Sequence, residues 1–333
     1  MRAYVLTRYG DARAMEFRDV PDPTPGDEEV LIRVRAAGLN PVDYKIREGK
    51  LRLINRLRLP IVAGSELSGV VEGVGPGVSR FAVGDRVFSR VDKHKLGAYA
   101  PYATVHQSIV AKMPATLDFA AAAGLPLAGL TALQALRDEL AVKAGDNVFI
   151  SGGAGGVGTL AIQLAAWMGA NVATTASPRG ADLVRSLGAG TVIDYRSERF
   201  KDLLSGYDGA FDLTGGQDLI DSFDILRRGS RTVSIAGMPD ATTARLDLDA
   251  GPLLTAALAV ASAKIHLQAR RRGVGYRYLF MHPSGADLDV LADLVDKGHL
   301  RPLIDRVFPF ADLAAAFTHL EQGHAKGKVV VQL

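Results

Sequence analysis

A glycine-rich turn between an apolar segment and a helix-forming segment is the feature that most constrains the fold. Phe149-Ile150-Ser151 precedes Gly152–Gly158, which carries the spacing G-x-G-x-x-G at Gly153, Gly155 and Gly158. Glycine lets the backbone approach a pyrophosphate, and a helix N-terminus offers N–H groups to phosphate oxygens. The spacing is weak evidence in a chain with 36 glycines, but its place after a strand and before a helix favours a dinucleotide site. The predicted cofactor-binding residues here are Gly153, Ala154, Gly155, Gly156, Val157 and Gly158.

Strand and helix patterns alternate along the second half of the chain. Apolar segments at 147–151, 171–175, 191–193, 209–213 and 232–235 alternate with helical patterns at 157–168, 181–187 and 219–226. This order is typical of an α/β fold with an open, doubly wound parallel sheet. We assign residues 123–299 to this dinucleotide-binding domain, with Tyr276 to Met281 and the helical pattern after it as a last unit of the same sheet.

The first third of the chain has a different, β-rich pattern. Short strands are predicted at 30–34, 67–72, 86–89 and 102–105, with glycines between them, which indicates a small barrel-like β domain. A helix is expected over 120–136 from its alanine and leucine content. The final segment, 328–332, has strand character and is expected to pair back onto the β domain. The predicted first domain is therefore 1–122 together with 300–333.

Composition limits the partners and the chemistry. The 39 basic and 36 acidic residues nearly balance, and no basic block resembles a nucleic-acid-binding stripe. The absence of cysteine excludes disulfides, thiolate metal sites and cysteine nucleophiles. The apolar window from Pro252 to Ile265 is shorter than the ~20 residues of a membrane span, and the N-terminus lacks a signal-peptide pattern. We expect no membrane or nucleic-acid partner and a cytoplasmic location.

The end of the second strand of the alternating pattern decides which dinucleotide is bound. An NAD site usually places a carboxylate about 20 residues after the glycine turn, against the ribose 2′-hydroxyl. Residues 174–180 contain no acid but offer hydroxyls, including Ser177, and the guanidinium of Arg179. These donors favour a 2′-phosphate, so the sequence predicts NADPH (NADP) as cofactor. The alternative, that Arg179 is a plain surface charge, stays open.

Several sequence blocks carry a resemblance to a known family. The blocks, in chain order, are Asn40-Pro41-Val42-Asp43, Gly64-Ser65-Glu66, Val83-Gly84-Asp85, Gly129-Leu130-Thr131-Ala132, the glycine turn, and Gly327-Lys328. Together they resemble the medium-chain dehydrogenase/reductase superfamily, and its zinc-independent quinone oxidoreductase and 2-alkenal (enone) reductase branch. The resemblance implies an N-terminal GroES-like β-barrel catalytic domain, a Rossmann domain and a homodimer. Pro252–Ile265 and Tyr276–Met281 are the expected dimer contacts.

Two departures from the zinc enzymes of that superfamily bear on the reaction. Asn40 or its neighbours lie where those enzymes carry a cysteine, and Ser65 stands where they carry a histidine. Zinc-assisted alcohol oxidation is therefore not expected. Without a metal, the feasible reaction is hydride delivery to an already activated acceptor, an α,β-unsaturated carbonyl or a quinone. Two alternatives stay open: a strict NADPH:quinone oxidoreductase, and a catalytically silent NADPH-binding protein.

The resemblance also implies roles for single residues. Asn40, Asp43, Tyr44 and Tyr99 are the implied catalytic residues, with Tyr44, Tyr99 or water as proton donor. Equally, Asn40 can be a cap of a helix starting at Pro41, and Tyr99 a core aromatic. The remaining residues implied to bind the cofactor are Thr131, Tyr195, Ala236, Gly237, Phe280, Met281 and Lys328.

Overall fold

The computed structural model describes residues 1–333, and the chain divides into two compact units. One unit comprises Met1–Leu130 together with Pro283–Leu333, and the other comprises Thr131–His282. The first contains the β-rich segments and the C-terminal strand, and the second contains the glycine turn. None of the helices is long and apolar enough to span a membrane.

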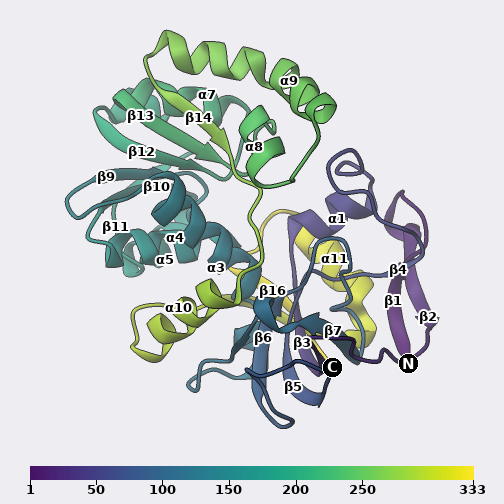
Figure 1. The fold of residues 1–333 in the computed structure, drawn as a ribbon. Coiled ribbons are helices and arrows are strands. Elements are labelled where there is room, and N and C mark those ends of the chain that lie inside the picture. Colours follow the sequence, from purple (N-terminus) through teal and green to yellow (C-terminus); the bar gives the residue numbers. More distant parts are fainter. The chain divides into compact units, whose positions relative to one another are not determined.

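The second unit contains a six-stranded, all-parallel sheet in the order β11-β10-β9-β12-β13-β14 (Figure 1). The strands are β9 (Asn147–Ile150), β10 (Asn171–Ala176), β11 (Ala189–Asp194), β12 (Tyr207–Asp212), β13 (Leu226–Ser234) and β14 (Gly275–Tyr278). From β9 the chain adds β10 and β11 on one side of the sheet, and it then returns to the other side of β9 to add β12, β13 and β14. Ligands of such sheets bind outside the carboxyl ends of the strands at this reversal point. The predicted doubly wound sheet is confirmed.

Helices cover both faces of this sheet. In Figure 1, α4 (Gly156–Trp167) and α5 (Pro178–Ser186) lie on one face, and α7 (Gly216–Ile225) and α9 (Pro252–Arg271) lie on the other. The short helices are α6 (Phe200–Leu203) and α8 (Ala241–Leu246). On the α6 and α7 face, Phe149 of β9 stacks on Phe200, with ring centroids 4.3 Å apart. Burial of these apolar faces stabilises the sheet that carries the glycine turn.

The helix expected over 120–136 is wrong as a single element. The structure forms α2 (Phe119–Ala123), then α3 (Pro126–Leu133), followed by one π-helical segment, η3 (Gln134–Glu139). Pro126 explains the break, because proline has no N–H and disfavours a helical conformation in the residue before it. Composition indicated the helical content of this segment but not its interruption.

The first unit is built on a seven-stranded sheet and a three-stranded sheet. The larger has the order β15-β16-β3-β5-β6-β8 with β7 also on β3, and the smaller has the order β2-β1-β4. The strands are β1 (Arg2–Leu6), β2 (Met15–Asp19), β3 (Glu29–Leu39), β4 (Ile61–Val62), β5 (Glu66–Val74), β6 (Arg86–Arg90), β7 (Tyr102–His106), β8 (Val110–Lys112), β15 (Ile304–Pro309) and β16 (Lys328–Gln332). β16 pairs antiparallel with β3, which confirms that the C-terminal strand returns to this domain.

The helices of the first unit are α1 (Pro41–Arg47), α2, α10 (Gly285–Asp296) and α11 (Leu313–Glu321), with most of α3. We expected α10 to belong to the dinucleotide-binding domain, whereas it packs on β8 and the 3-10 helix η2 (Gln107–Ile109) of the first unit. Asp289 on α10 also pairs with Arg80, with 2.7 Å between Nη2 and Oδ2. Helical periodicity identifies an apolar face but not the core against which that face packs.

Candidate functional site

The glycine turn leads directly from β9 into α4. Gly155 is the N-cap of α4 with an extended backbone, and Gly152 has a φ of +63°. A Cβ on Gly153 would lie 2.2 Å from Thr174 Oγ1, and one on Gly158 would lie 2.5 Å from the Gly152 carbonyl oxygen. Side chains are therefore excluded where the turn packs, and the first N–H groups of α4 have no helical partners. The turn fits a pyrophosphate group, as the sequence predicts.

Threonines of β10 hold the turn in place. Thr174 Oγ1 donates to the Ile150 carbonyl (2.6 Å), and Thr175 Oγ1 accepts from the Gly152 N–H (2.9 Å). The Gly153 N–H donates to the Thr175 carbonyl at 3.0 Å. Both side chains are buried. These two threonines thus fix the path of the turn, a role that sequence reasoning missed.

Asp212, at the end of β12, organises the same edge of the sheet and was also missed. Its buried carboxylate accepts from Ser234 Oγ (2.6 Å) and from the Gly215 N–H (2.9 Å). Ser234 Oγ in turn accepts from the N–H groups of Ala236 (3.1 Å) and Gly237 (2.8 Å). The loop with Ala236 and Gly237 is therefore fixed at the carboxyl end of β13, on the edge where the glycine turn lies. The signal in the sequence was an acid that ends an apolar strand just before a Gly-Gly pair.

The residues predicted to select the cofactor lie at the carboxyl ends of β10 and β11. Ser177 is the N-cap of α5 and makes no side-chain capping bond, while Arg179 and Tyr195 are exposed. The parallel register sets Asp194 opposite Ala176, so a carboxylate stands on the neighbouring strand. Its Oδ1 accepts from the Arg196 N–H at 3.0 Å. The prediction of NADPH depends on residues 174–180 and gives Asp194 no part in the choice of cofactor.

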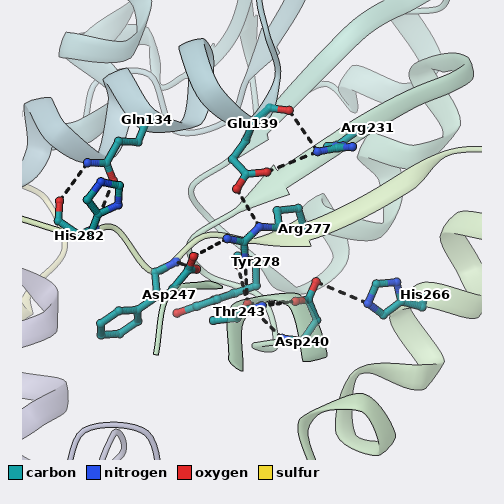
Figure 2. A network of polar contacts seen from close by, with 11 residues as sticks. Gln134, Glu139, Arg231, Asp240, Thr243, Asp247, His266, Arg277, Tyr278 and His282 are labelled. Atoms are coloured by element: carbon teal, nitrogen blue, oxygen red, sulfur yellow. Dashed lines mark hydrogen bonds and ion pairs between the residues drawn. The ribbon is translucent and has the colours of Figure 1, made fainter. Parts of the chain in front are cut away.

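A network of polar contacts surrounds Arg277, and a further pair joins Gln134 to His282 (Figure 2). Arg277 of β14 is only 4% exposed; its Nε donates to Glu139 Oε1 (2.8 Å) and its Nη2 to Asp247 Oδ1 (2.6 Å). Asp247 Oδ2 accepts from the Phe280 N–H at 2.9 Å. Gln134 then exchanges two hydrogen bonds with the backbone of His282. The backbone of residues 278–282 is therefore held at both of its ends, and burial raises the pKa of Tyr278 to about 12.

In the first unit, Asn40 is the N-cap of α1, as expected, and forms a capping box with Asp43. Asp43 Oδ2 accepts from the Asn40 backbone N–H at 2.8 Å, and the Asp43 N–H donates to the Asn40 carbonyl at 2.9 Å. Asp43 also accepts from Tyr99 Oη (3.0 Å) and from Ser65 Oγ. The start of α1 is thus held by hydrogen bonds between Asp43 and the backbone of Asn40. The side-chain amide of Asn40 has further partners.

The amide of Asn40 faces two charged side chains. Its Nδ2 donates to Glu66 Oε1 at 2.7 Å, and its Oδ1 accepts from Lys328 Nζ. Lys328 Nζ also donates to Glu66 Oε1 (2.7 Å) and to the Leu39 carbonyl (3.2 Å). All three N–H bonds of the ammonium are thereby used inside the first unit. The role of Lys328 as a cofactor ligand stays a prediction.

The other predicted catalytic side chains differ in accessibility. Tyr99 is completely buried, its ring lies edge-on to Phe317 at 5.9 Å, and burial together with Asp43 raises the pKa of its hydroxyl well above the usual value. Burial also raises the pKa of Asp43, against the opposing effect of its hydrogen bonds. Tyr44 is half-buried, and Thr131 is buried in α3. Tyr99 thus donates to Asp43, and Asp43 accepts from the backbone of Asn40, so both residues help to hold Asn40 in place. Proton donation by Tyr44 or Tyr99 stays a prediction.

No three His, Cys, Asp or Glu side chains gather in an arrangement that could hold a metal ion. The polar partners of Asn40 are the carboxylates of Glu66 and Asp43 and the ammonium of Lys328. The hydroxyl of Ser65 donates to Asp43.

Comparisons with known proteins agree with this architecture. Residues 26–115 match the family described as alcohol dehydrogenase GroES-like domain, and residues 187–331 match the family described as zinc-binding dehydrogenase. An NADPH-dependent alkenal/one oxidoreductase of Arabidopsis thaliana is 36% identical over 99% of this chain and 79% of its own. A 2-methylene-furan-3-one reductase of Solanum lycopersicum is 33% identical over the same shares. The solved quinone oxidoreductase of Coxiella burnetii is 33% identical, with a TM-score of 0.85 over 100% of this chain and 99% of that one.

The glycine turn, the strand order and the barrel-like unit define an oxidoreductase with a dinucleotide-binding domain. The chain belongs to the medium-chain dehydrogenase/reductase superfamily, in the quinone oxidoreductase and enone reductase branch.

Proposed function

We propose that this protein is a zinc-independent, NADPH-dependent reductase of α,β-unsaturated carbonyls or quinones. The observation that carries the proposal is the buried amide of Asn40, which is hydrogen-bonded to Glu66 on one side and Lys328 on the other. An amide N–H is a hydrogen-bond donor suited to an acceptor oxygen that gains negative charge during reduction. Relatives named for alkenal/one and furanone reduction support this acceptor class.

NADPH is the proposed cofactor because donors outnumber carboxylates beside the end of β10. Ser177 offers a hydroxyl without a capping bond, and Arg179 offers a guanidinium on the first turn of α5. Both favour a 2′-phosphate. Asp194 is the opposing carboxylate, on the neighbouring strand.

The residues of this chain then bind the cofactor and stabilise the acceptor oxygen during the reaction. Bound NADPH supplies the hydride. The glycine turn binds the pyrophosphate through backbone N–H groups, and Asn40 donates to the acceptor oxygen. Conjugation in the acceptor carries the developing charge to that oxygen, so one well-placed donor stabilises it. The proton that completes the reduction comes from water or from Tyr44, the more accessible of the two tyrosines.

Zinc independence is proposed from the identity of the polar side chains. An amide at position 40 and a hydroxyl at position 65 are poor zinc ligands compared with thiolate and imidazole. The Ser65 hydroxyl is already used by Asp43, and the Asn40 oxygen by Lys328. Metal analysis of the purified protein checks this part, and stoichiometric zinc required for turnover would overturn it.

One acceptor panel tests the function. NADPH oxidation is followed with a 2-alkenal, an open-chain enone, a cyclic enone and a benzoquinone. Turnover of the enones and alkenal is the expected result. Turnover of the quinone alone would establish the strict quinone oxidoreductase. Tight NADPH binding without turnover of any acceptor would establish a catalytically silent binding protein instead.

We also propose that the protein is a homodimer. Helix α9 leaves large apolar side chains in solvent at a spacing of seven, Leu253, Val260 and Leu267, and these are 87%, 78% and 50% exposed. β14 adds an open edge of the sheet. A second copy of the chain would cover both features. Light scattering that shows a monomer at micromolar concentration would refute this.

A further inference from the structure

We propose that Glu66 and Lys328 are positioning residues that set the orientation of the Asn40 amide, so that its single remaining Nδ2–H is directed to the acceptor oxygen. This inference rests on the proposed function and names two residues on which the kcat of that reaction would depend. Both residues act through Asn40 in this inference, because the three N–H bonds of Lys328 are used by Leu39, Asn40 and Glu66 and leave none for the predicted cofactor contact.

The charges of the two partners fix which way the amide points. A carboxylate accepts hydrogen bonds and an ammonium donates them, so the NH₂ end of Asn40 must face Glu66 and the oxygen must face Lys328. The reversed amide would set oxygen against carboxylate and NH₂ against ammonium. One Nδ2–H is used by Glu66, and the other makes no hydrogen bond. The amide therefore presents one donor in one orientation.

The surrounding backbone makes the arrangement rigid. Glu66 is completely buried, and its Oε2 accepts from the Leu127 N–H at the start of α3 (2.7 Å). Gly38 lies against the other oxygen, since a Cβ there would be 2.3 Å from Glu66 Oε1. Lys328 begins β16, directly beside the end of β3 that leads to Asn40. The two charged groups are therefore confined to their present partners. Leaving either buried charge without a partner would cost folding free energy.

The arrangement predicts a particular pattern of kinetic effects. Loss of the Asn40 donor should lower kcat by roughly 100-fold, as for other donors to a developing oxyanion. Loss of either positioning residue lets the amide turn, which should lower kcat by about 10-fold to 100-fold. The KM for NADPH should change little, because the side-chain partners of Glu66 and Lys328 are Asn40, Leu39 and Leu127 and each other, and none belongs to the nucleotide turn.

The experiment is a double-substitution cycle at positions 40 and 328. We expect Lys328→Met and Glu66→Gln to lower kcat, Lys328→Arg to restore much of it, and Asn40→Ala combined with Lys328→Met to be no slower than Asn40→Ala alone. Lys112→Met and Glu72→Gln, which change exposed ion pairs, are the matched controls and should keep the wild-type rate. Effects of the two substitutions that multiply in the double variant would overturn the proposal, because independent structural damage is additive in free energy.

A second readout separates this inference from the proposed function. The side-chain ¹⁵N–¹H₂ signal of Asn40, assigned by its loss in Asn40→Ala, should shift in Lys328→Met and in Glu66→Gln but not in the two controls. An unshifted signal in a folded Lys328→Met protein would overturn the positioning role. A shifted signal in a protein that reduces no enone or quinone would instead refute the proposed function and leave the orientation of the amide established.

Discussion

Lys328 Nζ lies 2.7 Å from Glu66 Oε1, although the two residues are 262 positions apart in the chain. Both side chains are buried, and each also contacts the amide of Asn40. The contact depends on β16 pairing with β3 and on β3 pairing with β5. The C-terminal strand therefore does more than complete a sheet, since it brings a cation to the residue proposed to act on the acceptor.

Arg277 is predicted to be important for the stability of the second unit. Arg277→Met removes a buried guanidinium that pairs with the partly buried carboxylates of Asp247 and Glu139, and should cost about 3–5 kcal/mol of unfolding free energy. Urea denaturation measures it. Arg231→Met is the matched control, because Arg231 contacts the same Glu139 from a half-exposed position and should cost less than about 1 kcal/mol. Equal losses in the two variants would contradict the assigned network.

Gly153 is predicted to tolerate no side chain. The Cβ of Gly153→Ala would meet Thr174 Oγ1 at 2.2 Å and Ile162 Cδ1 at 2.9 Å, so the turn must shift. We expect the KM for NADPH to rise at least roughly tenfold, because the N–H groups that bind the pyrophosphate move with the turn. Gly190→Ala is the control, since its nearest neighbour is the Val172 carbonyl oxygen at 3.8 Å. An unchanged KM in Gly153→Ala would show that this turn does not hold the nucleotide.

Cofactor choice is predicted to depend on Arg179. Arg179→Ala should raise the KM for NADPH by roughly tenfold and leave the KM for NADH unchanged, because only the 2′-phosphate loses a charge-assisted contact. Arg185→Ala, near the other end of α5, removes the same charge without touching this position. Equal KM values for both cofactors, unaffected by either variant, would show that neither Arg179 nor the 2′-phosphate matters.

Asp221 is predicted to stabilise the protein in a pH-dependent way. Burial alone would raise the pKa of this carboxyl, but hydrogen bonds from Gln217, Arg199 and Lys201 outweigh burial and lower it. The ionised form is therefore favoured in the folded state, so its stabilising contribution is complete above the ordinary pKa of 3.8 and is lost as the pH falls through the lowered value.

The test compares Asp221→Asn with the wild type from neutral pH downward. The variant should be less stable by about 1–2 kcal/mol at neutral pH, and the difference should shrink below about pH 4. Asp182→Asn, which changes a fully exposed carboxylate on α5, should show little difference at any pH. A stability difference for Asp221→Asn that is constant down to acid pH would contradict the ionised hydrogen-bonded form.

The doubly wound sheet and the glycine turn could be predicted from the sequence because both depend on local patterns. The period of apolar residues identifies strands and helices, and glycine marks a turn in which a Cβ has no room. The placement of α10 could not be predicted, since its apolar face fits either core and only the tertiary contacts with β8 decide.

The candidate site was predictable only in part, for a similar reason. Asn40 and Lys328 were found through short motifs, but their contact with each other depends on strand pairing across most of the chain. Asp212, Thr174 and Arg277 escaped notice because a buried polar residue looks ordinary in a sequence. Its importance appears only once its partners are known. The position of Asp194 beside the end of β10 could not be predicted, because Asp194 lies opposite Ala176 through the register of β10 and β11 and not along the chain.

The most direct test of the central claim is to identify the product of an open-chain enone after incubation with NADPH and metal-stripped protein. We predict that each NADPH consumed yields one saturated ketone, because hydride adds to the conjugated carbon while Asn40 stabilises the oxygen. The same assay on Asn40→Ala should yield the same product far more slowly. Formation of the allylic alcohol, or product only after zinc is added, would contradict the account.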